Sequence, residues 1–263
     1  MKRIGLKVAY DGTDFAGYQI QPNERTVQGE LESVLKNIHK GMSIRVTASG
    51  RTDTGVHARG QIVHFDTSLS FPVDRWPIAL NSQLPADICV LEAADVPADF
   101  HARYSAKTKE YRYRVLTSAQ ADVFRRNYTY HVRYPLDVEA MQRAAVQLLG
   151  THDFSSFCAA KAEVEDKVRT IEDVALWREG DELIFSIRGN GFLYNMVRII
   201  VGTLLEIGAG KRSAEEVAKI LAARSREAAG KTAPGHGLIS GRSNMTNGKL
   251  ENNKTTNPCV TKY

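Results

Sequence analysis

One carboxylate, Asp53, stands in a stretch of sequence whose composition suits acid chemistry. It lies between Gly50 and Gly55, with Arg51 and small hydroxyl residues beside it. Glycine adopts backbone angles that other residues resist, so both glycines are expected to allow a tight loop here. Arg51 is expected to keep the Asp53 carboxylate ionised, as a nucleophile requires. An aspartate in such a loop can also simply cap a turn, and the loop by itself leaves both interpretations open.

The segments on either side of this loop are expected to hold it in place. Residues 44–48 and 61–65 alternate apolar and polar side chains as strands do. A strand is also expected at 4–10, and a helix from Val27 to Ile38 with one apolar face. The order of elements in this region is strand, helix, paired strands, short helix and strand. It predicts an α+β fold with helices on one face of an antiparallel sheet.

The stretch from Arg103 to Arg133 is basic and aromatic. Eight Lys or Arg residues stand against two acidic ones, and six Phe or Tyr residues are interspersed among them. Cations for phosphates and rings for bases are how many proteins hold RNA, although a strand with a solvated basic face has the same composition. Residues 109–114 alternate, so Tyr111 and Tyr113 share one face of a strand. We expect contacts to an RNA backbone from Lys107, Lys109, Arg125 and Arg126.

A single arginine of the second half stands in an apolar segment. Arg198 follows Met196 and Val197, and a helix is expected to continue from there through Leu205. A charge in such surroundings needs an anionic partner. The sequence therefore predicts that Arg198 pairs with an acidic group.

Several runs of residues resemble one known family. The run Gly50–Ala58 reads G-R-T-D-T-G-V-H-A, which is similar to the signature of the TruA family of pseudouridine synthases. The D-T-G triplet alone would be weak evidence, because aspartic proteases share it, whereas the nonamer is far more specific. Further runs of the family follow in order: D-G-T-x-F-x-G-Y-Q from Asp11, L-N-x-x-L-P from Leu80, K-x-Y-x-Y from Lys109, G-x-H-D-F-x-x-F from Gly150 and G-x-x-F-L-x-x-M-V-R from Gly189.

The resemblance, which covers about residues 3–238, implies a fold, an activity and a set of site residues. The fold would be two α/β halves of the RRM or ferredoxin-like type, residues 1–104 and 105–239, sharing a central, mostly antiparallel sheet with the catalytic cleft between them. The activity would be isomerisation of uridine to pseudouridine in the anticodon stem-loop of tRNA, at positions 38–40, by a homodimer. The implied residues are Asp53 as the catalytic group, Tyr111 against the target base, Arg198 paired with Asp53, and Arg51 and Leu238 at the substrate.

The composition agrees with this reading and excludes other classes. A formal charge of +5 suits an anionic partner. No apolar run approaches the roughly 20 residues of a membrane helix, and the N-terminus enters a strand pattern without a signal peptide. Cys89, Cys158 and Cys259 form no C-x-x-C pair, which argues against a disulfide framework or a zinc site. No phosphate-binding glycine loop or dinucleotide fingerprint is present. We expect a cytoplasmic protein with no cofactor and no metal.

Two alternatives and one anomaly accompany this prediction. An aspartic protease is disfavoured, because such enzymes need two carboxylates that share a proton and the chain has one D-T-G copy. A catalytically impaired relative that only binds RNA would need a defect elsewhere in the chain. The single candidate for a defect is the end of the chain, where residues 240–263 are polar and show no strand pattern. We expect this tail to be disordered.

Overall fold

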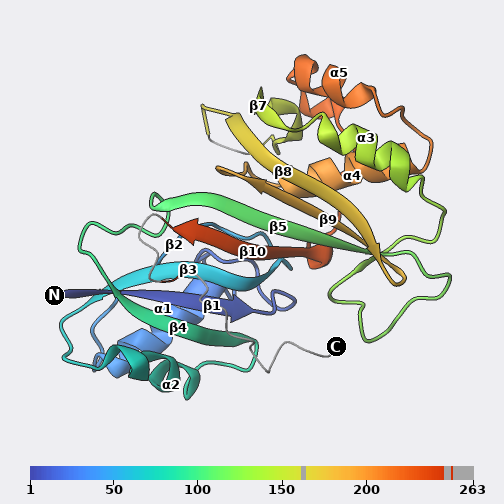
Figure 1. Cartoon of the computed structure of the whole chain (residues 1–263). Helices are drawn as coiled ribbons and strands as arrows, with labels where there is room; N and C mark the ends of the chain where they lie inside the picture. Colours follow the sequence, from blue (N-terminus) through green and yellow to red (C-terminus); the bar gives the residue numbers. More distant parts are fainter. Residues whose placement is uncertain (161–163, 246–249, 251–263) are drawn as a thin grey trace.

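The computed structural model describes residues 1–160, 164–245 and 250 of the chain, and ten strands of this part form one sheet. Eight of them follow one another in the order β4-β1-β3-β10-β5-β9-β8-β7 (Figure 1), while β2 pairs with β3 and β6 with β5. All pairs are antiparallel except β10 with β3 and β5 with β6. The predicted α+β class with a mostly antiparallel sheet is confirmed. The strands are β1 (Lys2–Tyr10), β2 (Thr47–Ala48), β3 (His57–Thr67), β4 (Ile88–Val96), β5 (Ala106–Leu116), β6 (Tyr130–His131), β7 (Gly150–Asp153), β8 (Val168–Glu179), β9 (Glu182–Gly189) and β10 (Leu238–Met245).

The helices pack on the sheet as two separate groups, one for each half of the chain (Figure 1). α1 and α2 lie against the strands β1, β3 and β4, α3 and α4 lie against β5, β8 and β9, and α5 packs against α3. The helices are α1 (Val27–Ile38), α2 (Trp76–Asn81), α3 (Val138–Val146), α4 (Met196–Gly208) and α5 (Glu216–Ala223); short 3₁₀ turns lie at Val73–Arg75, Ser155–Phe157, Arg226–Ala228 and Gly235–Gly237. No described helix is long and apolar enough to cross a membrane.

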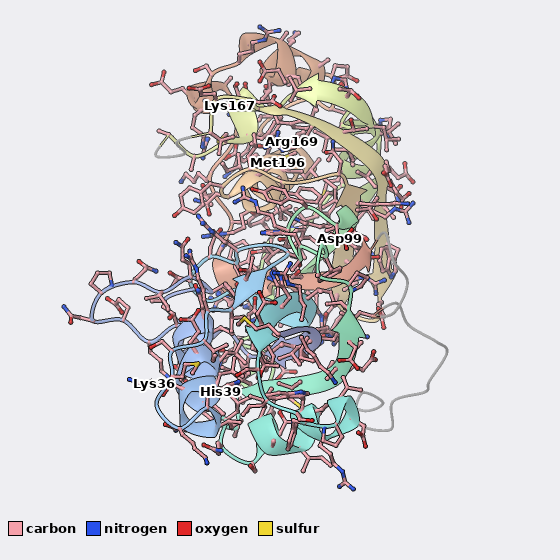
Figure 2. All side chains as sticks on the ribbon, turned by 90° about the vertical axis from the view of Figure 1, so that its left-hand side faces the viewer. Lys36, His39, Asp99, Lys167, Arg169 and Met196 are labelled. Atoms are coloured by element: carbon pink, nitrogen blue, oxygen red, sulfur yellow. The ribbon has the colours of Figure 1, made fainter. Side chains whose placement is uncertain are left out.

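Each group of helices covers its own hydrophobic core. The apolar face predicted for the first helix is buried in the structure, and its N-cap Thr26 accepts a hydrogen bond from the backbone of Gly29. Figure 2 shows both cores from the side, with His39, which stacks on Trp76, in the lower one and Met196 in the upper one. The middle of the sheet lies between the two cores. The boundary between residues 104 and 105 stays a prediction.

The strand β10 contradicts the expectation for the end of the chain. Leu238–Met245 lies inside the sheet, where Ile239 and Ser240 pair with β3, and residues 238–240 and 243–245 pair with β5 on either side of an irregularity. A central strand is stabilised by hydrogen bonds and packing on both sides, so it does not need an alternating pattern of its own. The predicted disorder is therefore wrong for residues 240–245. Most of the remaining tail lies outside the described residues.

Candidate active site

The loop that carries Asp53 joins β2 to β3 and is tied to the segment after β1. The backbone N–H of Tyr18 donates to the carbonyl of Thr52 at 3.0 Å. Gly55 has a φ of 73°, which a residue with a side chain rarely adopts. Gly50 has no positive φ, so the expectation of a special backbone angle is wrong for that residue. The loop thus presents Asp53 from a fixed backbone at the start of β3, a strand in the interior of the sheet.

The cation that faces Asp53 is Arg198 from the first turn of α4. Its Nη1 atom lies 3.2 Å from Oδ2 of Asp53, and the two side chains are 18% and 20% exposed. Burial raises the pKa of Asp53, and the charge and hydrogen bond of Arg198 oppose that rise. The structure therefore brings together a carboxylate and an arginine that are 145 residues apart in the sequence. The ionising partner is Arg198 rather than the exposed neighbour Arg51, to which the sequence analysis gave that role.

Two further contacts fix the guanidinium of Arg198. Its Nε atom donates to the carbonyl of Ala233 at 2.8 Å, and Nη1 also donates to Oδ1 of Asn195 at 2.8 Å. Asn195 has left-handed backbone angles, with φ 61°, at the N-cap of α4, and its side chain makes no cap hydrogen bond. That side chain is free to hold Arg198 instead. Asn195 was not among the residues predicted from the sequence.

Tyr111 approaches the same site from β5. Its side chain is 8% exposed, and its ring lies edge-to-face against Phe192 with centroids 5.1 Å apart. Burial raises the pKa of Tyr111 to about 12, the charge of Asp53 adds to the rise, and a hydrogen bond with Ser240 of β10 lowers it in part. At neutral pH the hydroxyl is therefore protonated and can donate a hydrogen bond.

A cavity of about 660 Å³ opens between the two halves, a volume within the usual range for small-molecule sites. It is lined by six of the predicted site residues: Arg51, Asp53, Lys109, Tyr111, Arg198 and Leu238. Arg45 and Arg103 bring its cations to five, against a single carboxylate among the described lining residues. Such a lining favours an anionic ligand. No group of His, Cys, Asp or Glu in the described part of the chain could hold a metal ion.

The predicted cations differ in how far their charge is available. Lys109 donates from Nζ to the carbonyl of Ser49 at 2.6 Å, and burial, with nearby arginines, lowers its pKa to about 8. Lys107 is exposed and does not line the cavity. Arg126 is exposed and donates to the Val123 carbonyl.

Arg125 is held by acidic groups of the protein itself. It lies 2.6 Å from Asp122, 2.7 Å from Asp181 and 2.9 Å from Glu182. Three carboxylates around one guanidinium leave little positive potential for a phosphate. An RNA contact by Arg125 stays a prediction that this geometry does not favour.

A second residue that was not predicted from the sequence lies behind the loop that carries Asp53. His57 is buried, and its Nδ1 accepts a hydrogen bond from the backbone of Gly12 at 2.9 Å. Its Nε2 faces the carbonyls of Asn127 at 2.8 Å and His236 at 3.1 Å, and its Nδ1 also lies 3.1 Å from Oδ1 of Asp11. Its place at the end of the signature run was the available signal. His57 ties the loop to both halves of the chain.

A cationic cavity built around one carboxylate, between two α/β halves of a shared sheet, suits an enzyme that acts on an anionic substrate such as a nucleic acid. The family described as tRNA pseudouridine synthase matches residues 7–105 and 144–243. The chain belongs to this family, which confirms the resemblance drawn from its sequence runs. It is an isomerase that converts uridine to pseudouridine in tRNA.

Individual relatives agree with the family. The tRNA pseudouridine synthase A of Anoxybacillus flavithermus is 61% identical over 238 residues, which are 90% of this chain and 96% of the relative. The tRNA pseudouridine synthase A of Shouchella clausii is 60% identical over 238 residues, which are 90% of this chain and 91% of the relative. A match to the solved archaeal box H/ACA sRNP Nop10-Cbf5 complex covers 90% of this chain and 47% of the solved chain, at 11% identity and a TM-score of 0.38.

Proposed function

We propose that the chain isomerises uridines 38–40 in the anticodon stem-loop of tRNA, with Asp53 as the catalytic carboxylate. The observation that supports Asp53 most directly is its contact with Arg198 inside the cationic cavity, at 3.2 Å. The sequence runs shared with the TruA family support the choice of the anticodon stem-loop. The same resemblance supports a cytoplasmic homodimer.

The reaction requires the target base to leave its stack before the carboxylate can reach it. The cavity is large enough to receive the base and its sugar. Asp53 then attacks C1′ of the ribose or C6 of the uracil, or stabilises a glycal route. In each route the bond from C1′ to N1 breaks and a bond from C1′ to C5 forms. N1 gains a proton and C5 loses one, so no co-reactant is consumed.

The neighbouring side chains have separate roles in this proposal. Arg198 keeps Asp53 ionised and oriented against the effect of burial. The ring of Tyr111 packs against the base, and its hydroxyl acts as a hydrogen-bond donor because its pKa is about 12. Arg51 at the cavity wall fills the space that the flipped base leaves, or contacts a neighbouring phosphate.

The alternative of an impaired relative that only binds RNA has lost the defect on which it depended. That alternative depended on a missing closing strand after residue 239, and β10 occupies that position as far as Met245. The aspartate, tyrosine and arginine of the site all line one cavity. A functional enzyme is therefore the better proposal.

The decisive experiment is tritium release from tRNA labelled at C5 of uridine. Asp53→Asn keeps the shape and removes the charge, so release should fall below detection. Its affinity for tRNA should stay within about twofold of the parent protein, because the phosphate contacts lie elsewhere. Asp74→Asn is a matched control, since Asp74 is exposed on the 3₁₀ turn before α2. Normal tritium release by Asp53→Asn would overturn the assignment.

A further inference from the structure

An aromatic side chain that the proposed reaction does not use stands exposed on the turn that follows β4. Tyr104 is 77% exposed. Its ring nevertheless lies against the ring of His101, with centroids 4.4 Å apart and planes inclined at 32°. An exposed ring that rests on a second ring is held in one orientation, and its large exposed fraction leaves surface available to another flat group.

The turn under this ring is anchored to the sheet. The backbone N–H groups of Tyr104 and Ser105 both donate to the carbonyl of His101, at 3.0 and 2.8 Å. The neighbouring Ala102 is fully buried and donates from its backbone to Nδ1 of His64 on β3 at 3.2 Å. The position of Tyr104 is therefore set by the sheet.

The same turn borders the catalytic cavity. Arg103 lines the cavity, and its guanidinium carbon lies 5.9 Å from the centre of the Tyr104 ring. Along this edge of the molecule, the cavity is followed by the cation of Arg103 and then by the exposed ring of Tyr104. An RNA strand with one base in the cavity presents the same order, because a phosphate separates that nucleotide from the next base.

We propose that Tyr104 is a stacking platform for the unpaired base next to the target uridine, with Arg103 at the phosphate between them. This proposal rests on the proposed function, since it requires an RNA strand with a flipped base in the cavity. Aromatic rings bind single-stranded bases with little preference for sequence, because every base has a π face. The platform would therefore hold the strand open beside different target positions without specifying the neighbouring base.

The test compares three substitutions at Tyr104 in the full chain, with the isolated anticodon stem-loop RNA as the probe. Tyr104→Ala and Tyr104→Leu should each raise the Kd by about five- to a hundredfold, the effect of losing one stacked base. Tyr104→Phe should bind as the parent does. Phe124→Ala is the matched control, since Phe124 is 88% exposed and does not line the cavity. Normal affinity of Tyr104→Ala, or full affinity of Tyr104→Leu, would overturn the platform.

A fluorescent base gives a readout that loss of structure alone would not reproduce. 2-Aminopurine is placed on the 5′ or the 3′ side of the target uridine, and stacking on Tyr104 should change its fluorescence on binding at one of these positions. The change should persist in Tyr104→Phe and disappear in Tyr104→Ala. A signal that is unchanged in Tyr104→Ala at both positions would contradict the proposal.

Repeating the binding measurements in an Asp53→Asn background separates this proposal from the proposed function. Weaker binding by Tyr104→Ala in that background supports the platform whether or not Asp53 proves catalytic. Normal binding by Tyr104→Ala, together with loss of tritium release in Asp53→Asn, would reject the platform and leave the proposed function intact.

Discussion

At the scale of single residues, the charge state of Asp53 results from two opposing effects. Burial raises its pKa, and Arg198 lowers it. A raised pKa means that Asp53 takes up a proton at a higher pH than an ordinary aspartate does. If the ionised form reacts, the rate rises with pH as Asp53 loses its proton. The contacts that orient Arg198 should then control the acid side of the pH–rate profile.

Asn195 is expected to act on this profile through Arg198. Asn195→Gly keeps the left-handed backbone and removes the acceptor 2.8 Å from Nη1. A less restrained Arg198 stabilises the carboxylate less, so the pKa of Asp53 should rise further. The acid limb of the kcat/KM profile should move to higher pH and kcat should fall about tenfold, the loss of one hydrogen bond to a charged group.

Three further variants make the Asn195 result interpretable. Arg198→Met should shift the acid limb further in the same direction. Added to Asp53→Asn, it should cost little more activity, because the two residues act as a unit. Arg224→Gly replaces another left-handed residue, with φ 49°, that does not line the cavity, and should leave the profile unchanged. An acid limb that stays in place in Asn195→Gly would contradict a positioning role.

The sequence could identify the residues whose chemical type at a motif position determines their role. It could not identify residues whose role depends on their position in the folded chain. Asp53, Tyr111 and Arg198 stand at defined positions of their runs, and the structure places all three at one cavity. Asn195 stands at a variable position of its run, and its contribution depends on a backbone angle and a distance. The role predicted for Arg51 was wrong for the same reason. Its position next to Asp53 in the sequence does not place its charge at the Asp53 carboxylate.

At the scale of elements, β10 is the piece that joins the two halves. It lies between β3 and β5, with two parallel pairs on one side and a longer antiparallel ladder on the other. Its first residue, Leu238, lines the cavity, and Ser240 pairs with Tyr111. The sequence Leu238–Met245 could not reveal this strand, because its glycine and polar residues interrupt any alternation. Its neighbours determine its conformation.

Two shortened chains test the contribution of β10. A chain that ends after Met245 keeps the strand and loses the buried Leu250, which packs against Ile62 and Phe100. It should lose about 2–4 kcal/mol of stability and remain folded. A chain that ends after Gly237 lacks the strand that joins the halves and should show no cooperative transition. Calorimetry and hydrogen exchange at β3 and β5 are the measurements, and equal stability of the two chains would refute this role.

At the scale of the whole molecule, the position of the charges matters more than their sum. The net charge of +5 is modest. The cavity nevertheless gathers five cations around one carboxylate, whereas Arg125, in the basic stretch, is surrounded by three carboxylates. Composition could predict an anionic partner from the basic stretch. It could not show which cations the protein neutralises internally, since Asp181 lies in the turn before β9 and Glu182 is the first residue of β9, both far from Arg125 in the sequence.

The salt dependence of tRNA binding should separate these two kinds of cation. Each phosphate contact contributes about one counterion to the slope of log K against log salt. Arg51→Gln removes an exposed charge at the cavity and should reduce the slope by about 1. Arg125→Gln leaves Asp122 and Asp181 without their arginine and Glu182 with Arg114 alone, so it should lower the melting temperature, while the slope changes by much less than 1. Titrations of each variant with tRNA at several salt concentrations measure this slope. A flatter slope in Arg125→Gln with no change in Arg51→Gln would place the RNA on the surface around Asp122 instead of at the cavity.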